Sequence, residues 1–169
     1  MEACRSAILE AAKPHLFNTA TWGPFCDVTL TLRQARQSDT GDWVKIDENQ
    51  CKRAFQHFSN LLNRAIYKSA FDRHGQKLRV LPVLERGNPG RWHIHCAVEM
   101  PSHIHATSFE KLICNCWTKV RWAYDRALVR DGTDEGWVAY MLKPRQKSGF
   151  DSVLDCIILE SLHNPIADA

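Results

Sequence analysis

The sequence has no long hydrophobic run and no paired cysteine motif, and each absence excludes a class of protein. No uncharged apolar stretch approaches the roughly 20 residues that cross a bilayer, so we expect no membrane segment. The first residues carry Glu2, Arg5 and Glu10, unlike the apolar core of a secretory signal. The seven cysteines are odd in number and contain no C-x-x-C pair, so we expect reduced thiols that pack as small hydrophobic side chains.

What remains is the composition of an ordinary globular domain. The chain has 169 residues, of which 44% are hydrophobic and 24% charged, with no repeat or low-complexity segment. We therefore expect a single domain over residues 1–169. The net charge of +3 says little about partners, but residues 52–79 hold seven basic side chains against one acidic one. Such a basic surface suits a phosphate-bearing partner, although a solvated helix face explains the cluster more simply.

Hydrophobic periodicity divides the chain into strands and helices. Alternation and β-branched residues predict strands over 25–33, 78–85, 92–99, 122–130 and 153–159. Helical spacing and capping signals predict helices over 3–12, 49–70, 107–120 and 133–143. Thr107 and Glu110 resemble a capping box, and Thr133 an N-cap. Strands 78–85 and 92–99 flank the turn sequence Gly87-Asn-Pro-Gly90, which makes an antiparallel hairpin and favours an α+β fold with helices on the faces of an antiparallel sheet.

The strongest chemical signal is the pair His93 and His95 in the strand over 92–99. Residues two apart on a strand face the same side, so the two imidazoles lie side by side. Glu85 joins them on that face if it pairs directly with His93 across a five-residue connection. A four-residue loop closed by Arg86 and Arg91 would turn Glu85 to the opposite face. Two imidazoles and a carboxylate are suitable ligands for a divalent metal.

Simpler explanations of these histidines stay open. A half-exposed strand that happens to contain two histidines accounts equally well for one His-x-His motif. A second such motif, His103-Ile104-His105, lies at a junction between strand and helix, where period-two geometry is not assured. We prefer the first motif because it lies in a hairpin strand with an acid opposite.

A second constellation is Tyr140 with Lys143, three residues apart on a predicted helix and therefore on one face. A free phenol has a pKa of about 10 and is a weak nucleophile at neutral pH. A neighbouring ammonium group or a metal-bound phosphate would activate it for attack on a phosphodiester. For an isolated Tyr-x-x-Lys motif, packing of Tyr140 with Trp137 against the sheet is the simpler explanation.

In this order the motifs resemble those of the HUH endonucleases, and specifically the rolling-circle replication initiators (Rep proteins). The first motif of that family is a strand with alternating threonine, which residues 25–32 (FCDVTLTL) resemble, although Cys26 and Asp27 depart from its plainer apolar pattern. The second is His-hydrophobic-His, here His93 to His95, and the third is Tyr-x-x-Lys, here Tyr140 to Lys143. Glu85 falls where the family places an acid.

The resemblance implies a central five-stranded antiparallel sheet flanked by helices and an enzyme that nicks and rejoins single-stranded DNA. Tyr140 would attack the scissile phosphate and keep the 5′ end, with Lys143 orienting it. Mn²⁺ or Mg²⁺ would be held by Glu85, His93 and His95. Candidate DNA-contacting residues, chosen by their position in the sequence, are Arg33, Arg36, Arg91, Trp92 and Arg145.

The resemblance also implies partners and a compartment. The DNA would be an origin or hairpin sequence, and a host helicase or polymerase would extend the freed end. The location would be the cytoplasm for a bacterial, plasmid or phage protein, or the host nucleus for a eukaryotic virus. Three alternatives stay open: a Y1-type transposase of the same superfamily, a cupin-like metal protein using Gly87, His93, His95 and Glu99, and a non-catalytic DNA-binding module.

Overall fold

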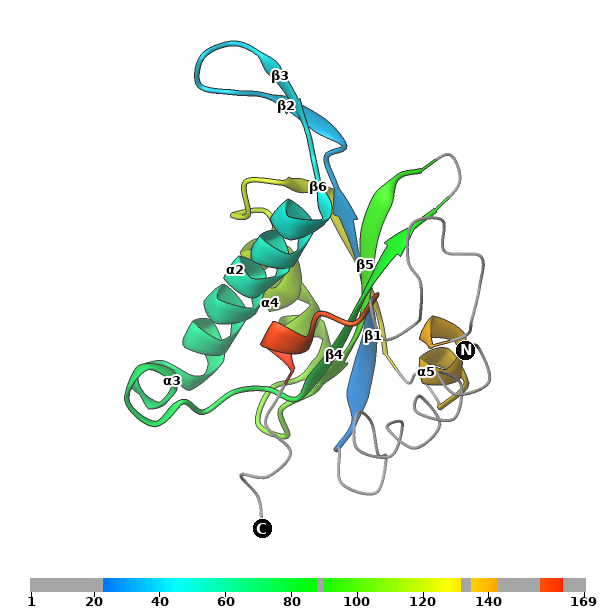
Figure 1. Ribbon diagram of the computed structural model, residues 1–169. Coiled ribbons are helices and arrows are strands. Elements are labelled where there is room, and N and C mark those ends of the chain that lie inside the picture. The colour runs from blue at the N-terminus through cyan, green and yellow to red at the C-terminus, as the bar shows by residue number, and fades with distance from the viewer. Residues whose placement is uncertain (1–22, 88–89, 132–134, 143–155, 163–169) are drawn as a thin grey trace.

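The computed structural model describes residues 23–87, 90–131, 135–142 and 156–162. Its main sheet has the strand order β4-β5-β1-β6, with every neighbouring pair antiparallel. A separate two-stranded sheet forms an arm that projects beyond one end of the main sheet (Figure 1). The strands are β1 (Phe25–Leu32), β2 (Ala35–Gln37), β3 (Trp43–Lys45), β4 (Val80–Arg86), β5 (Trp92–Glu99) and β6 (Ala123–Arg130). The helices are α2 (Glu48–Tyr67), α3 (Ser69–His74), α4 (Ala106–Trp117), α5 (Glu135–Met141) and the short 3-10 helix η1 (Leu159–Ser161). The predicted α+β class is therefore confirmed.

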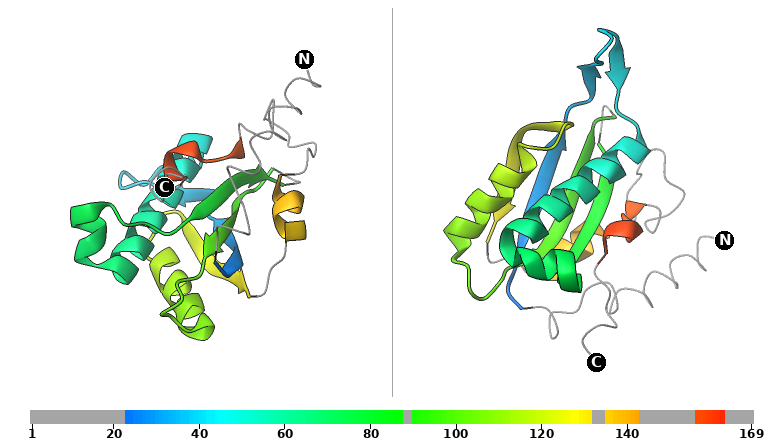
Figure 2. Two further views of the ribbon diagram at one scale, coloured as in Figure 1. Left: turned by 90° about the horizontal axis from the view of Figure 1, so that it is seen from below. Right: turned by 90° about the vertical axis from the view of Figure 1, so that its left-hand side faces the viewer.

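One face of the sheet is covered by α2 and α4, which lie side by side across it (Figure 2, right). Apolar side chains of α2 recur at helical spacing and pack on the inward residues of β1 and β5, such as Leu30 and Ile94. Phe58 of α2 meets Trp117 of α4 edge-on, with ring centroids 5.7 Å apart. Asp47 and Gln50 form a capping box at the start of α2, which explains where this helix begins.

The opposite face is covered by α5 (Figure 2, left). A second apolar cluster lies between α5 and the sheet, and it contains Phe25, Leu81, Val83, Ala97, Val138, Met141, Leu142, Cys156 and Ile157. His93 and His95 lie on the same face as Ala97, because they occupy alternate positions of β5. The layers therefore leave the histidine end of this face beside α5, while the helices α2 and α4 are on the far side.

The expected fifth strand over 153–159 is not present as a strand in the described residues. Residues 156–158 approach the outer edge of β4, but they make only an isolated bridge between Val83 and Ile157. The Ile158 N–H donates to the Pro82 carbonyl over 3.1 Å. Pro82 has no N–H with which to return a bond on that edge, so the ladder ends there. The main sheet therefore has four strands among the described residues instead of five.

The predicted capping box of α4 is wrong. The helix begins one residue earlier, at Ala106, and His105 is its N-cap without a side-chain cap hydrogen bond. The helix predicted over 49–70 is divided at Lys68, whose φ of 50° ends α2. The predicted helix over 3–12, the Thr133 cap and residues 153–155 lie outside the described residues. Among the helices that the structure does describe, none is both long and apolar enough to span a bilayer.

Candidate metal centre and tyrosine

The hairpin of β4 and β5 brings the acid to the histidines in the predicted register. Glu85 pairs directly with His93, and Arg86 with Trp92, which leaves a five-residue connection over 87–91. The Gly87 N–H donates to the Arg91 carbonyl over 2.9 Å and closes this connection. Because paired residues of neighbouring strands share a face, Glu85, His93 and His95 converge on the side of the sheet that carries α5.

These three side chains form a compact cluster of metal-type ligands. One potential ligand atom from each residue lies within 4.8 Å of the others, and in the described part of the chain this is the one group of that kind. His95 Nε2 lies 3.2 Å from Glu85 Oε2. All three residues are half-buried, so the cluster is shielded yet open on one side. A carboxylate and two imidazoles fit a divalent transition metal and leave positions for other ligands.

Aromatic rings connect this cluster to the predicted tyrosine. The rings of His93 and His95 meet edge-on at a centroid distance of 5.1 Å. Trp137 of α5 lies edge-on to His95 at 5.4 Å, and Tyr140 stacks on Trp137 at 5.3 Å with an interplanar angle of 13°. Tyr140 nevertheless stays 39% exposed. The packing with Trp137 is thus real, and it holds an accessible phenol two ring contacts from His95. Lys143 lies outside the described residues.

Two residues that sequence reasoning missed shape the surroundings of the histidines. Thr29 pairs with His95 across β1 and β5, and its Oγ1 lies 3.0 Å from His95 Nδ1. Gly87 leaves room for the other ring, since a Cβ at this position would lie 2.9 Å from His93 Cε1. The alternation of Thr29 with Thr31 was visible in the sequence, but the pairing of β1 with β5 was not.

The residues proposed from sequence position to contact DNA have mixed roles. The Arg33 Nε–H donates to the Ala123 carbonyl over 2.8 Å, and Arg36 lies over the Trp122 ring at 5.5 Å, so both hold local structure. Trp92 is half-buried against the core beneath α2 and α4, as its alternation with His93 predicts. Arg91 is exposed in the hairpin connection. Arg145 lies outside the described residues.

The outer strand β6 presents an accessible surface beside the cluster, and the sequence analysis did not single it out. Leu128 pairs with Thr29, which in turn pairs with His95, so the three form one row across the sheet. Alternate positions of β6 place Tyr124, Arg126 and Arg130 on the side of Leu128. All four side chains are exposed, Tyr124 by 55% and Leu128 by 50%. This combination of arginines with an exposed ring suits a single-stranded nucleic acid.

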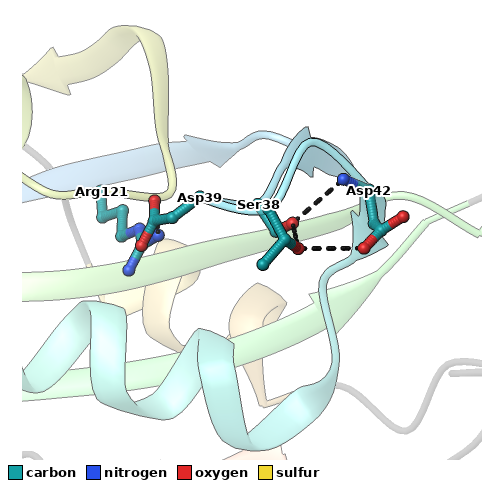
Figure 3. A network of polar contacts seen from close by, with 5 residues as sticks. Ser38, Asp39, Asp42 and Arg121 are labelled. Carbon is teal, nitrogen blue, oxygen red and sulfur yellow. Dashed lines mark hydrogen bonds and ion pairs between the residues drawn. The ribbon is translucent and has the colours of Figure 1, made fainter.

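The arm made by β2 and β3 carries a further exposed aromatic residue. Trp43 is 74% exposed. Ser38 and Asp42 hydrogen-bond across the tip, and Arg121 forms an ion pair of 2.9 Å with Asp39 that ties the arm to the loop before β6 (Figure 3). At the base of the arm, the Gln34 side chain accepts from the Trp92 N–H and donates to the Trp92 carbonyl. The arm is therefore fixed at its base next to His93.

The cysteines have no nucleophilic role in this arrangement. The six described cysteines are free, and five of them are buried, in line with the expected reduced thiols. Burial raises the pKa of Cys26 and of Cys51 to about 12, and raises that of Cys96 well above its usual value of 9.0. These thiols stay protonated at neutral pH, so they are poor nucleophiles and poor metal ligands.

The fold and geometry also exclude the cupin-like alternative. A cupin is a double-sheet jelly roll, whereas the described residues form one antiparallel sheet layered with helices. Glu99, the acid of the partial cupin pattern, accepts from the Arg79 N–H at 3.2 Å. It is not among the grouped ligand atoms, where Glu85 takes the acidic position.

Comparison with known proteins agrees with this arrangement. No curated protein and no solved structure matches the chain significantly. The model of one protein family, described as replication-associated protein ORF2, matches residues 25–148. The match begins with β1 and extends past Tyr140, so it includes Glu85, His93 and His95. Because it covers well over half of the sequence, the chain belongs to this family of replication-associated proteins.

Proposed function

We propose that this chain nicks and rejoins single-stranded DNA in a metal-dependent reaction that initiates rolling-circle replication. The observation that carries the proposal is the placement of an exposed phenol beside a metal-type cluster. Trp137 contacts both His95 and Tyr140, so the nucleophile and the Glu85–His93–His95 cluster are supported by one indole ring. The family match supports a role in replication.

The cluster would hold Mn²⁺ or Mg²⁺ through Glu85, His93 and His95. Imidazole ligands favour Mn²⁺ over Mg²⁺, which prefers oxygen ligands. Such an ion supplies Lewis acidity that polarises a phosphate oxygen and neutralises charge at the phosphorus. The protein contributes the position and orientation of the ligands, which β4 and β5 hold through direct cross-strand pairing.

Tyr140 is the proposed nucleophile. Its phenolic oxygen forms a bond to the phosphorus as the bond from phosphorus to the 3′ oxygen breaks. The phenol loses its proton to solvent, and the leaving 3′ oxygen gains one and becomes a hydroxyl that primes synthesis. One phosphodiester is exchanged for another, so the reverse reaction rejoins the strand. Lys143, three residues after Tyr140, is proposed to orient the tyrosine or the phosphate.

The DNA is proposed to cross the open face of β6 on its way to the cluster. Arg126 and Arg130 would contact phosphates, and Tyr124 would stack on a base. Arg91 lies in the connection next to His93 and is proposed to contact the same strand. A host helicase and polymerase would extend the freed 3′ end, and the protein would act in whichever compartment holds the replicating DNA.

The test uses single-stranded DNA with randomised centres, incubated with the full chain and Mn²⁺ and resolved on a denaturing gel. A DNA label at the 3′ end should remain attached to the protein, because Tyr140 keeps the 5′ end of the downstream fragment. A label at the 5′ end should appear in a shorter free fragment. Tyr140→Phe should form no adduct, and His93→Ala should form none because the cluster loses a ligand.

The matched control is Tyr124→Phe, which removes the hydroxyl of another exposed tyrosine on β6. This variant should still form the adduct, because a phenylalanine ring also stacks on bases. An adduct that persists in Tyr140→Phe would refute the assignment of the nucleophile. The Y1-type transposase alternative predicts the same adduct, so a plasmid replication assay with the selected DNA is needed to separate the two roles.

A further inference from the structure

Both ring nitrogens of His95 have a hydrogen-bonding partner. Nε2 lies 3.2 Å from Glu85 Oε2, and Nδ1 lies 3.0 Å from Thr29 Oγ1. The two partners differ in chemistry. An ionised carboxylate only accepts hydrogen bonds, whereas a hydroxyl both donates and accepts and can rotate between the two.

A neutral imidazole carries its one proton on either Nδ1 or Nε2, and its partners must match. Without a metal, the carboxylate of Glu85 selects the ring with the proton on Nε2, and Nδ1 then accepts from the Thr29 hydroxyl. A metal bound through Nε2 requires the lone pair there, so the proton must lie on Nδ1. In that form the ring donates and Thr29 accepts.

We propose that Thr29 is a positioning residue whose hydroxyl lets His95 exchange one tautomer for the other when the metal binds. The inference rests on the proposed function, since it takes the Glu85–His93–His95 cluster as the metal centre. The ring releases the Nε2 proton to solvent and takes up a proton at Nδ1, so its charge does not change. The hydroxyl turns from donor to acceptor, and the ring stays in place throughout.

The position of Thr29 suits this role. It occupies the middle of β1, directly paired with His95, in the same cross-strand row. It is half-buried, so water competes only partly for its hydroxyl. Branching at Cβ limits the side-chain rotamers and holds Oγ1 toward the ring. A carbonyl or carboxylate in this place would serve only the tautomer that donates from Nδ1.

The chain contains a matched control on the same strand. Thr31 lies two residues further along β1 on the same face and pairs with His93. Its hydroxyl donates to the Arg126 carbonyl over 2.7 Å. Thr31→Val therefore removes the same chemical group at the same face of the sheet, but the hydroxyl it removes belongs to a backbone contact of β6.

The first measurement is a Mn²⁺ titration of the full chain, with free Mn²⁺ followed by electron paramagnetic resonance. Thr29→Val should weaken Mn²⁺ binding by about 10- to 100-fold, the usual effect of losing a partner behind a histidine ligand. Thr29→Ser keeps the hydroxyl and should restore most of the affinity. Thr31→Val should bind Mn²⁺ as the unaltered chain does.

The second measurement reads the tautomer directly by ¹⁵N magnetic resonance of the His95 ring, with Zn²⁺ as a diamagnetic substitute. The unaltered chain should carry the proton on Nε2 without metal and on Nδ1 with Zn²⁺. A proton already on Nδ1 in the metal-free chain would overturn the exchange, and so would equal Mn²⁺ affinity in Thr29→Val and Thr31→Val. If Thr29→Val does not fold, Thr29→Ser and this measurement still decide.

Failure of the metal centre itself would look different. In that case the unaltered chain would bind no Mn²⁺, or His93→Ala and Glu85→Gln would bind it unchanged. That result would remove the proposed metal dependence together with the inference. Intact Mn²⁺ binding that depends on His93 and Glu85 but is indifferent to Thr29→Val would remove the inference alone.

Discussion

Gly87→Ala tests how closely the hairpin connection is fitted to His93. The added Cβ would lie 2.9 Å from His93 Cε1 and 3.7 Å from its Nε2, whereas ordinary contacts begin near 3.4 Å. Gly87 does not have a left-handed φ, so the substitution adds no backbone strain. The clash is with the end of a side chain, and the ring can therefore move away without disrupting the fold.

The size of the effect follows from that movement. The ring must retreat by about 0.5 Å, which exceeds the tolerance of about 0.2 Å on metal–ligand distances. We expect Mn²⁺ affinity to fall about 10-fold, equivalent to about 1.4 kcal/mol of binding free energy. The free energy of unfolding without metal should change by less than about 1 kcal/mol, since no buried contact is lost.

The assay pairs a Mn²⁺ titration with urea unfolding of the same samples. Gly23→Ala is the control, because the nearest heavy atom to its Cβ would be 4.0 Å away and its φ is not left-handed. It should retain Mn²⁺ affinity. Equal affinity in Gly87→Ala and Gly23→Ala would refute the argument that His93 needs the missing side chain. A large loss of stability in Gly87→Ala would place the effect in folding instead.

Two further predictions concern buried polar side chains. Asn63→Ala should lower the free energy of unfolding by about 1–3 kcal/mol in urea, since the Asn63 Oδ1 accepts the buried Leu78 N–H at 2.7 Å and nothing would replace it; an unchanged midpoint would show that water takes its place. Burial raises the pKa of Asp27 above 3.8, opposed in part by Arg130, so the native state binds this proton more tightly than the unfolded chain and stability falls as pH rises through that raised pKa. Asp27→Asn should therefore be more stable than the unaltered chain near neutral pH, and the difference should vanish below pH 3.8; the exposed Arg130, 4.0 Å away, offsets little of this. A variant that is less stable at neutral pH would show that the ion pair outweighs burial.

Local patterns in the sequence determined much of this protein. Period-two alternation predicted β1, β4, β5 and β6 within a few residues, and helical spacing predicted α2. The length of the connection after β4 predicted that Glu85 pairs with His93. These features depend on neighbours in the chain, so a hairpin and its two histidines could be read without knowing what packs on them. The start of α4 was misplaced because capping residues also occur inside a first turn.

Only the tertiary structure decided which segments meet at the cluster. Thr29 reaches His95 across 66 residues of sequence, because β1 lies between β5 and β6 in the sheet. Trp137 and Tyr140 reach the histidines because α5 packs on the apolar cluster of the same face. The missing donor of Pro82 limits residues 156–158 to a bridge at the sheet edge. Strand order and helix docking depend on burial of whole faces, which no short stretch of sequence encodes.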